Sequence, residues 1–581
     1  MALTTEKVQE QITTLIENAF KSAEQKGVLP SCEAAPFIIE VPADKANGDF
    51  STNAAMVNAR TFRLSPRKIA DTILSELSCE GTYFEKIEVA GPGFINFFLN
   101  SRFYADVLLD IEREGENYGK SNYGQGKKVN VEFVSANPTG PMHMGNARGG
   151  ALGDCLAAVL EYAGYDVSRE FYVNDAGNQI AKFALSLDIR YQQHFKGEDS
   201  VELPEDSYHG ADIIKRAEEF AEVYGNSYLE KSEEERRKAL VEFALPKNIK
   251  EMKQAMEKYR IRYDTWFSEL TLHNDGELKD TIDLLKERGY TYEKDGALWY
   301  KNIEVQTEML KEQGKSREYI DKLELKDDVL IRANGNPTYF AADIAYHRNK
   351  LEKRGFEKAI DVWGADHHGH IARMKGAMRA VGIDENRLDV LLMQLVRLMS
   401  GGQLVRMSKR TGKAITLVNL LDEVPIDAVR FMFNMQEPGS VMDFDLDLAV
   451  QESSQNPVYY CQYAHARICS ILSKLEQEGR CYSKCTGKEL ERLTESEERA
   501  LISHLSRLPS VIVGAAKNYD PAKVTHYVVE LATLFHKFYN ACRVNVEDEE
   551  LMKARLFLCV CVRNTIRNVL TLLKVDVPSR M

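Results

Sequence analysis

A glycine-rich turn at residues 135–154, SANPTGPMHMGNARGGALGD, combines residue types that could handle a phosphate. The apolar segment KKVNVEFV precedes it and ALGDCLAAVLEY follows, so the turn joins a predicted buried strand to a predicted helix. Glycine costs about 0.5–1 kcal/mol in regular structure, so a cluster of it indicates close approach to the backbone. His143 can donate a hydrogen bond to a developing phosphate charge, and Gly145 lets a nucleotide lie against the main chain. A tight turn with a surface histidine is the alternative.

A second stretch, GGQLVRMSKRTGKAITL at 401–417, follows the last predicted strand–helix pair. Its cations suit a triphosphate, and its flanking glycines are typical of a loop that closes over a ligand. A solvated basic face is the alternative. The basic residues are Arg406, Lys409, Arg410 and Lys413.

Parallel strands would bring these two stretches to one edge of a sheet. KKVNVEFV, SREFYVND, AIDVWGAD and VLLMQLV are buried-strand patterns separated by helical segments, which is typical of βαβ units. We therefore predict an α/β fold with a doubly wound, Rossmann-like parallel sheet. Ligands bind such sheets outside the carboxyl ends of the strands, at the switch point, where the glycine-rich turn would lie.

The chain divides into three predicted domains. Residues 1–115 combine a helical start with the alternating strand KIEVAGPGFINFFL and form an α+β module. Residues 116–440 hold the sheet, with acidic, lysine-rich helices at about 190–325 that we interpret as one insertion, and with the basic loop at 401–413. Residues 441–581 show apolar faces at helical spacing and form an all-α bundle.

Composition narrows the class of protein. The chain has 581 residues, too many for a single domain of about 100–200 residues. A net charge of −13 argues against indiscriminate coating of nucleic acid but leaves a local basic groove open. The start, MALTTEKVQEQITTLIENAF, lacks the basic flank and apolar run of a secretion signal, and we expect a cytoplasmic protein with no membrane partner. The ten cysteines show no doubled zinc spacing and are expected to be reduced.

The two stretches together resemble the signature motifs of class I aminoacyl-tRNA synthetases. His143-Met144-Gly145-Asn146 is similar to the HIGH motif, and RMSKR, from Arg406, to the KMSKS motif. The segments VEFVSANPTGPMHMGNARGG, FYVNDAGNQI, DTWFSEL, VWGADHHGHIARMKGA, YYCQYAHARI and the ending VPSRM resemble arginyl-tRNA synthetases specifically, and the likeness spans essentially the whole chain. Asn146 departs from the second histidine of HIGH. Asparagine keeps a hydrogen-bond donor but can never be cationic.

The resemblance implies an ATP site without a covalent enzyme intermediate. His143 and Asn146 would donate to the phosphate in the transition state, and Lys409 would stabilise the leaving pyrophosphate. Arg406 replaces the first lysine of KMSKS and keeps its charge. The other residues implied to contact ATP are Gly145, Gly364, Asp366, His367, Met407 and Ser408.

The resemblance also implies a second set of residues, which would select the amino acid substrate. A guanidinium prefers planar, bidentate carboxylate partners. Tyr339 and Asp343 are four residues apart, hence on one helical face, and the resemblance assigns both to an arginine pocket. It also implies Glu269 as a second carboxylate and Asn137 near the α-amino end. The alternatives are a helix pair of Asp343 with His347 and a solvated loop acid at Glu269.

The histidines of GADHHGH could suggest a metal cluster. His367, His368 and His370 have no carboxylate or cysteine set at ligand spacing beside them. The resemblance implies that they surround the ATP site. We therefore predict no dedicated protein metal site, with Mg²⁺ entering together with ATP.

The N-terminal module and the C-terminal bundle are implied to contact tRNA. In the family the first C-terminal helix faces the anticodon arm, where stacking rings and cations suit single-stranded bases. The N-terminal module is thought to meet the outer corner of the tRNA. Core packing is the alternative for the aromatic residues. The residues assigned to tRNA are Tyr459, Tyr463, His465 and Arg467.

The implied function is ATP-dependent ligation of L-arginine to its cognate tRNA through an arginyl-adenylate, by a protein expected to be a monomer. The arginine carboxylate would attack the α-phosphate, and the terminal 2′-hydroxyl of the tRNA would then attack the adenylate. The alternative is a synthetase-like tRNA-binding or regulatory protein whose catalysis is weakened by Asn146.

Overall fold

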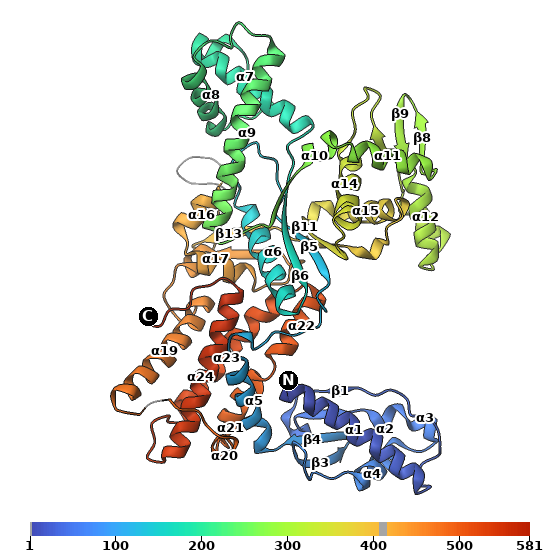
Figure 1. Ribbon diagram of the computed structural model, residues 1–581, viewed down its shortest axis with the longest axis vertical. Coiled ribbons are helices and arrows are strands. Elements are labelled where there is room, and N and C mark those ends of the chain that lie inside the picture. The colour runs from blue at the N-terminus through green and yellow to red at the C-terminus, as the bar shows by residue number, and fades with distance from the viewer. Residues whose placement is uncertain (1–2, 406–414, 481) are drawn as a thin grey trace.

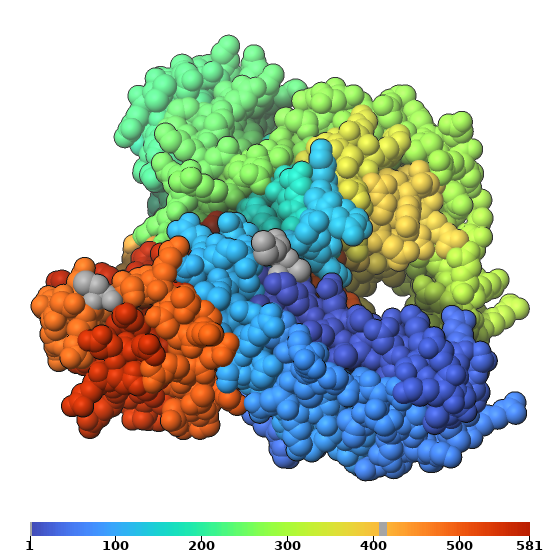
Figure 2. Space-filling view, turned by 60° about the horizontal axis from the view of Figure 1, so that its bottom comes forward, coloured from blue at the N-terminus to red at the C-terminus, as the bar shows by residue number. Residues whose placement is uncertain are grey.

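The computed structural model describes residues 3–405, 415–480 and 482–581. Figure 1 shows a central parallel sheet with two lobes at one end, a helical bundle at the other, and the N-terminal module beside the bundle. In Figure 2 an opening lies between that module, in blue, and the yellow-green lobe. No helix within these ranges has the length and apolar character needed to cross a bilayer. The cysteines in the same ranges are all free.

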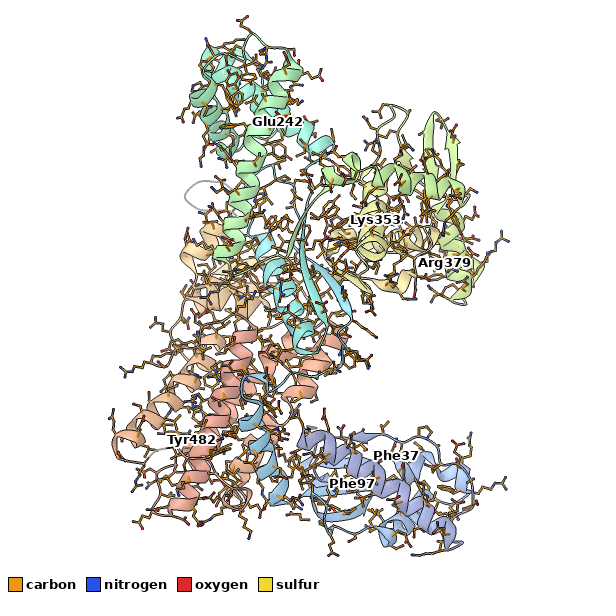
Figure 3. The ribbon with its side chains drawn as sticks, viewed as in Figure 1. Phe37, Phe97, Glu242, Lys353, Arg379 and Tyr482 are labelled. Carbon is orange, nitrogen blue, oxygen red and sulfur yellow. The ribbon has the colours of Figure 1, made fainter. Side chains whose placement is uncertain are left out.

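The N-terminal module is a four-stranded antiparallel sheet, ordered β1-β2-β4-β3 and covered by helices. Its first helix buries Val8, Ile12 and Ile16, the spacing of an amphipathic helix. In the β3–β4 turn, Gly93 has a φ of 143°, and a Cβ there would lie 2.9 Å from the backbone of Pro66, so glycine is required. Figure 3 shows Phe97 of β4 within this module. The elements are α1 (Thr4–Gln25), β1 (Ile39–Glu40), β2 (Phe50–Thr52), α2 (Ala54–Val57), α3 (Ala59–Phe62), α4 (Pro66–Glu76), β3 (Phe84–Ala90), β4 (Phe94–Leu99) and α5 (Ser101–Glu114).

The central sheet has five parallel strands in the order β12-β11-β5-β6-β7. The chain winds outward from β5 to β7, returns to the other side of β5 as β11, and continues to β12. This order confirms the predicted doubly wound α/β fold. Helix α6 (Gly145–Tyr162) makes the first crossover. The strands are β5 (Lys128–Glu132), β6 (Asp166–Val173), β7 (Thr265–Ser268), β11 (Lys358–Gly364) and β12 (Leu388–Met393).

The expectation of one insertion at about 190–325 is wrong, because β7 lies inside that range and belongs to the central sheet. Phe171 of β6 is opposite Trp266 of β7, and the two rings stack with centroids 4.3 Å apart. The chain therefore leaves the sheet twice. The first excursion is a three-helix lobe with its own apolar core, labelled at Glu242 in Figure 3. Its helices are α7 (Asn178–Lys196), α8 (Ala211–Tyr224) and α9 (Glu233–Lys258).

The second excursion, between β7 and β11, forms a lobe around a three-stranded antiparallel sheet, β10-β9-β8. Its last helix, α14, runs into a π-helical turn, Asn349–Lys353, and so returns the chain to β11. Helix α15 (His368–Ala380), which follows β11, packs on this lobe. The elements are α10 (Glu269–Asn274), α11 (Glu277–Glu287), β8 (Thr291–Lys294), β9 (Ala297–Tyr300), α12 (Asn302–Glu312), α13 (Arg317–Asp321), β10 (Asp328–Ile331) and α14 (Tyr339–Arg348).

Beyond β12, a small three-stranded sheet, β14-β13-β15, leads to the C-terminal bundle. The bundle confirms the predicted all-α end of the chain, but the predicted start at residue 441 is too early, because β15 belongs to the small sheet. The last helix of the bundle is buried along most of its length. The connecting elements are β13 (Val396–Ser400), β14 (Gln403–Leu404), α16 (Leu417–Glu423), α17 (Ile426–Phe433), β15 (Met442–Asp445) and α18 (Leu446–Ala449). The bundle helices are α19 (Pro457–Gln477), α20 (Gly487–Leu490), α21 (Ser496–Leu505), α22 (Leu508–Asn518), α23 (Ala522–Ala541) and α24 (Glu549–Leu572).

Candidate active site

The carboxyl ends of β5 and β11 are neighbours at the point where the sheet reverses its winding direction. In doubly wound sheets the crevice at this point binds ligands. The sequence-predicted residues divide between its two sides: Asn137, His143, Gly145 and Asn146 follow β5, and Gly364, Asp366 and His367 follow β11.

The loop that leaves β5 begins with strained backbone. Val134 and Ser135 have φ values of 74° and 22°, a region that residues other than glycine rarely adopt. The hydroxyl of Ser135 donates to Glu132 over 2.7 Å and accepts from the N–H of Tyr172 over 3.0 Å. These bonds hold the strain in place at the entrance to the glycine-rich turn, as is common at functional sites.

The turn around His143 is tied to the chain that leaves the basic loop. The N–H of Met144 donates to the carbonyl of Ile415 over 2.9 Å, and the N–H of Leu417 donates to the carbonyl of Met142 over 2.9 Å. The exposed His143 therefore lies beside Thr416. The expected site residues of the loop itself, Arg406, Met407, Ser408 and Lys409, lie outside the described residues.

Asn146 has a defined orientation in this turn. Its Oδ1 accepts a hydrogen bond of 2.9 Å from the N–H of His143. A backbone N–H requires an acceptor, so the carbonyl oxygen of the amide faces the main chain and the NH₂ group is the end left to donate elsewhere. An asparagine can therefore serve as a donor at this position.

Glycine occupies the positions of this turn for different physical reasons. A Cβ on Gly153 would lie 2.1 Å from the ring of Phe133, and one on Gly150 would lie 2.8 Å from Ile261. These two allow α6 to pack closely on its neighbours. A Cβ on Gly145 would meet nothing within 4 Å. Only part of the glycine cluster is thus free to face a ligand.

A cavity of about 900 Å³ opens in front of the turn. Asn137, His143 and Asn146 line one wall, and residues of the first lobe, including Tyr208 and Asp212, line the other. Small-molecule sites commonly occupy 300–1,000 Å³. The cavity therefore unites three of the predicted residues in a space large enough for a nucleotide.

Acidic side chains, Glu269 and Asp343, gather where β7 ends and α14 begins, and we name this place the acidic pocket. Glu269 is buried and Asp343 is partly exposed, and the negative charge of Asp343 acts on Glu269. Burial, and to a smaller extent the charges of Asp343 and Asp175, raise the pKa of Glu269 to about 7. The only ion-pair partner of Glu269 among the described residues is His273, at 3.7 Å, and burial lowers the pKa of that histidine. Glu269 is therefore an acid without a permanent cation, not a solvated loop residue.

Tyrosines frame the acidic pocket. The ring of Tyr339 lies against Gly177, where a Cβ would be 3.2 Å from its hydroxyl oxygen. The hydroxyl of Tyr172 is buried beside the carboxylate of Glu269, toward which it can donate. Burial and the nearby carboxylates of Glu269 and Asp343 raise the pKa of Tyr172 well above its usual value. Within the described chain the pocket thus offers Glu269 a tyrosine hydroxyl but no lysine or arginine.

A relay of side chains that the sequence did not reveal holds Asp343. Its Oδ2 lies 3.0 Å from Nε2 of His370, and Nδ1 of His370 lies 2.9 Å from a guanidinium nitrogen of Arg373. Arg373 also donates to Asp328 over 2.7 Å. The expected alternative for Asp343 does not occur, since His347 bonds its backbone carbonyl and not its carboxylate. The spacing of His370 and Arg373, one helical turn apart, is the signal that could have found the relay.

The residues after β11 are more exposed. The side chains of Asp366 and His367 are 83% and 58% exposed, and they lie 3.7 Å apart. No cluster of three or more histidine, cysteine or acidic residues suited to a metal ion occurs within the described ranges.

The four residues of α19 that were assigned to tRNA differ in exposure. Arg467 stacks over Tyr539 at 4.3 Å and reaches Tyr463, which is exposed. Tyr459 is half-buried. The expectation for His465 is wrong, because this residue is buried and its Nδ1 bonds the carbonyl of Pro578 over 2.9 Å.

Comparison with known families matches nearly the whole chain. Residues 8–99 match the arginyl tRNA synthetase N terminal domain, and residues 109–470 match the catalytic domain of tRNA synthetases class I (R). Residues 461–581 match the DALR anticodon binding domain.

Individual relatives agree with these matches. The chain is 54% identical to the arginine–tRNA ligase of Caldanaerobacter subterraneus subsp. tengcongensis and 52% identical to that of Ruminiclostridium cellulolyticum, each over 99% of both chains. Its fold is similar to that of Thermus thermophilus arginyl-tRNA synthetase, with a TM-score of 0.72, 22% identity, and coverage of 98% of this chain and 100% of the other.

Proposed function

The chain belongs to the class I arginyl-tRNA synthetases and is an arginine–tRNA ligase that uses ATP, and from this premise we propose how its residues divide the reaction. We assign the cavity before the glycine-rich turn to ATP and the acidic pocket to the arginine side chain. Arginine, ATP and tRNA are its partners.

In the first step the arginine carboxylate attacks the α-phosphate and pyrophosphate leaves. Phosphoryl transfer depends mainly on positioning and charge stabilisation, which we assign to His143, Asn146 and Lys409. We assign further ATP contacts to Arg406, Gly145, Gly364, Asp366, His367, Met407 and Ser408. Mg²⁺ would enter on the ATP phosphates and neutralise their charge, since phosphates supply most of its ligands in such sites.

The acidic pocket supports arginine as the substrate. A guanidinium would supply the missing cation to Glu269 and Asp343, and its N–H groups would donate to their carboxylates. Tyr339 would close the pocket, and Asn137 would hold the α-amino end. This uncompensated buried acid is the single observation that carries the assignment.

In the second step the terminal 2′-hydroxyl of the tRNA attacks the adenylate carbonyl and AMP leaves. We assign the anticodon arm to the bundle, α19 to α24, through Tyr459, Tyr463 and Arg467, and the outer corner of the tRNA to residues 1–115. We further propose a cytoplasmic monomer. No observation favours a tRNA-binding protein with weakened catalysis, since the amide of Asn146 keeps its donor.

Aminoacylation with each of the twenty amino acids tests the assignment of the pocket. The wild type is expected to charge tRNA with arginine alone. Glu269→Gln should lose arginine-dependent pyrophosphate exchange while keeping the affinity for ATP. Equal loss of both substrates would contradict the separate pockets.

A further inference from the structure

A second cavity, of about 610 Å³, lies between the N-terminal module and the helical bundle. None of its lining residues belongs to the candidate active site. One wall comes from α1, the loop at 41–50 and Phe103, and the other from α21, α22 and α23. Figure 2 shows the two bodies, blue and orange, side by side. The volume suits a small ligand.

A buried histidine in this cavity has an unused acceptor. His504 is 4% exposed, and its Nε2 lies 2.9 Å from the carbonyl of Tyr527, so Nε2 carries the proton. Burial lowers the pKa of His504 and favours the neutral ring. Nδ1 then carries a lone pair and is a hydrogen-bond acceptor, and within the described chain it has no hydrogen-bond partner. A buried polar atom of this kind calls for a donor that a ligand would supply.

Glu530 shows which kind of donor fits. Its carboxylate is the nearest charged group, 3.7 Å from Nδ1 of His504, and it also lines the cavity. Two acceptors at this separation cannot bond each other. An amino group, with two hydrogens, satisfies both.

The rim of the cavity offers positive charge. Lys45 from the module and Arg507 from the bundle both line it, and neither forms an ion pair with a described carboxylate. The other two acids of the lining, Glu6 and Asp49, accept hydrogen bonds from backbone N–H groups of their own module. Lys45 and Arg507 are therefore cations of the lining that an anionic group can meet. The apolar residues of the lining include Phe50, Leu99, Phe103, Val513 and Leu534.

We propose that this cavity binds a nucleoside 5′-monophosphate whose base carries an amino group, with AMP as the ligand. The amino group meets His504 and Glu530, the base lies against the apolar walls, and the phosphate meets Lys45 and Arg507. AMP combines these three features and is released by the ligase reaction, so it is present wherever the protein works.

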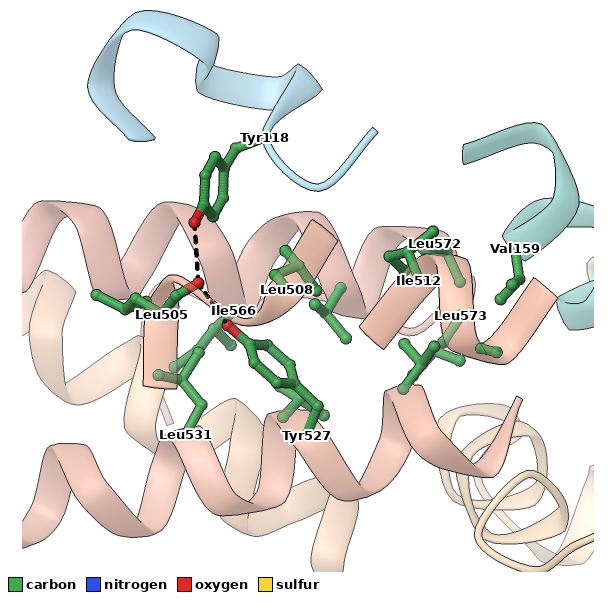
Figure 4. Packing of buried hydrophobic residues seen from close by; sticks show 14 of the residues in the cluster. Tyr118, Val159, Leu505, Leu508, Ile512, Tyr527, Leu531, Ile566, Leu572 and Leu573 are labelled. Carbon is green, nitrogen blue, oxygen red and sulfur yellow. Dashed lines mark hydrogen bonds between the residues drawn. The ribbon is translucent and has the colours of Figure 1, made fainter. Parts of the chain in front are cut away.

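The position of the cavity gives the ligand a structural consequence. Figure 4 shows that Tyr118, which follows α5, and Tyr527 both donate to the carbonyl of Leu505, over 2.9 and 3.3 Å. Leu505 is next to His504 in the chain. A nucleotide held between Lys45 and Arg507 would thus fasten the module to the bundle at their joint.

Calorimetric titration with AMP tests the proposal. The protein is first saturated with a non-hydrolysable arginyl-adenylate analogue, which fills the adenylate site. One further equivalent of AMP is expected to bind. Purine riboside 5′-monophosphate, which lacks only the amino group, should bind at least about tenfold more weakly, because the hydrogen bonds to Nδ1 of His504 and to the carboxylate of Glu530 are both lost.

Variants locate the bound AMP. Lys45→Ala and Arg507→Ala should each weaken AMP binding about tenfold, the effect of one charge-assisted contact to phosphate. Lys517→Ala removes a matched exposed cation of α22 that does not line the cavity, and it should leave binding unchanged. The absence of a further AMP equivalent, or equal affinity in all three variants, would overturn the proposal.

Discussion

Helix α14 carries charge at both ends, and the two ends differ in how that charge is compensated. At its C-terminal end, Lys350 in the π-helical turn is fully buried between Asp361, at 2.8 Å, and Glu132. His347 lies 2.6 Å from the other oxygen of Asp361. In the N-terminal half of the helix, Asp343 faces Glu269 with no lysine or arginine among the described residues paired to either.

The pKa values of Asp361 and Glu269 express the same contrast, whereas burial and the charge of Asp361 raise the pKa of Glu132 despite Lys350. Burial alone would raise the pKa of Asp361, but Lys350 and His347 hold it down at about 2. The pKa of Glu269 is instead raised to about 7, because burial meets no opposing cation. A carboxylate that supports the fold is thus accompanied by cations of its own chain. A carboxylate without them marks the place where a cationic ligand is missing.

The largest expected effect concerns the paired end. Lys350→Met leaves Glu132 and Asp361 buried without their cation, and we expect the free energy of unfolding to fall by about 3–5 kcal/mol. Lys353→Met, in the same π-helical turn, breaks a half-exposed pair with Glu277 and should cost less than about 1 kcal/mol. Urea denaturation of both variants measures this. Similar losses in the two would show that burial does not distinguish them.

The unpaired end should affect catalysis and not folding. Asp343→Asn keeps the size and the contact with His370 but removes the charge proposed to face the guanidinium. We expect kcat/KM for arginine to fall by an amount that corresponds to about 2–4 kcal/mol of lost transition-state stabilisation, with little change in the KM for ATP. Steady-state kinetics decide this, and an equal loss for both substrates would make Asp343 a structural residue.

Without arginine, Glu269 should make the fold less stable as the pH rises. Its pKa rises from 4.5 in the unfolded chain to about 7 in the folded one, so between these values the folded protein binds more protons. We expect the wild type to lose about 2–3 kcal/mol relative to Glu269→Gln between pH 4.5 and pH 8. Thermal or urea unfolding across this range checks the sign. Parallel pH profiles for the two proteins would contradict it.

The smallest effect is expected at Asn146. Asn146→Ala removes both the acceptor for the N–H of His143 and the proposed donor. It should raise the activation free energy of adenylate formation by about 1 kcal/mol or more. Asn146→His should cost less, since an imidazole can accept at one nitrogen and donate at the other. Pyrophosphate exchange compares them. A fully active alanine variant would exclude position 146 from phosphate stabilisation.

The sequence predicted the parts of the fold that depend on local pattern. Long apolar strands followed by helices indicated the doubly wound sheet, and helical periodicity indicated the bundle. The strand β7 was missed because it has four residues between a long charged helix and α10, too short a pattern to outweigh its surroundings.

The candidate site was predictable where motifs are contiguous. The turn from Asn137 to Asn146 was found as one stretch. The bond between His370 and Asp343 was not found, because packing joins two helices at residues 27 positions apart. The ion pair of Lys350 with Glu132 was missed for the same reason, since it spans 218 positions of sequence. His465 was misassigned because its partner, Pro578, comes from the far end of the chain.

Proton release on arginine binding tests the central claim most directly. If a guanidinium supplies the missing cation, arginine must bind the ionised form of Glu269, and at pH 6.5 the wild type should release a proton. Calorimetry in buffers of different ionisation enthalpy measures that number. The wild type is expected to release about three-quarters of a proton, because a group with a pKa of about 7 is protonated to that extent at pH 6.5, and Glu269→Gln is expected to release none. Binding of arginine with no proton release by the wild type, or with the same release by both proteins, would contradict it.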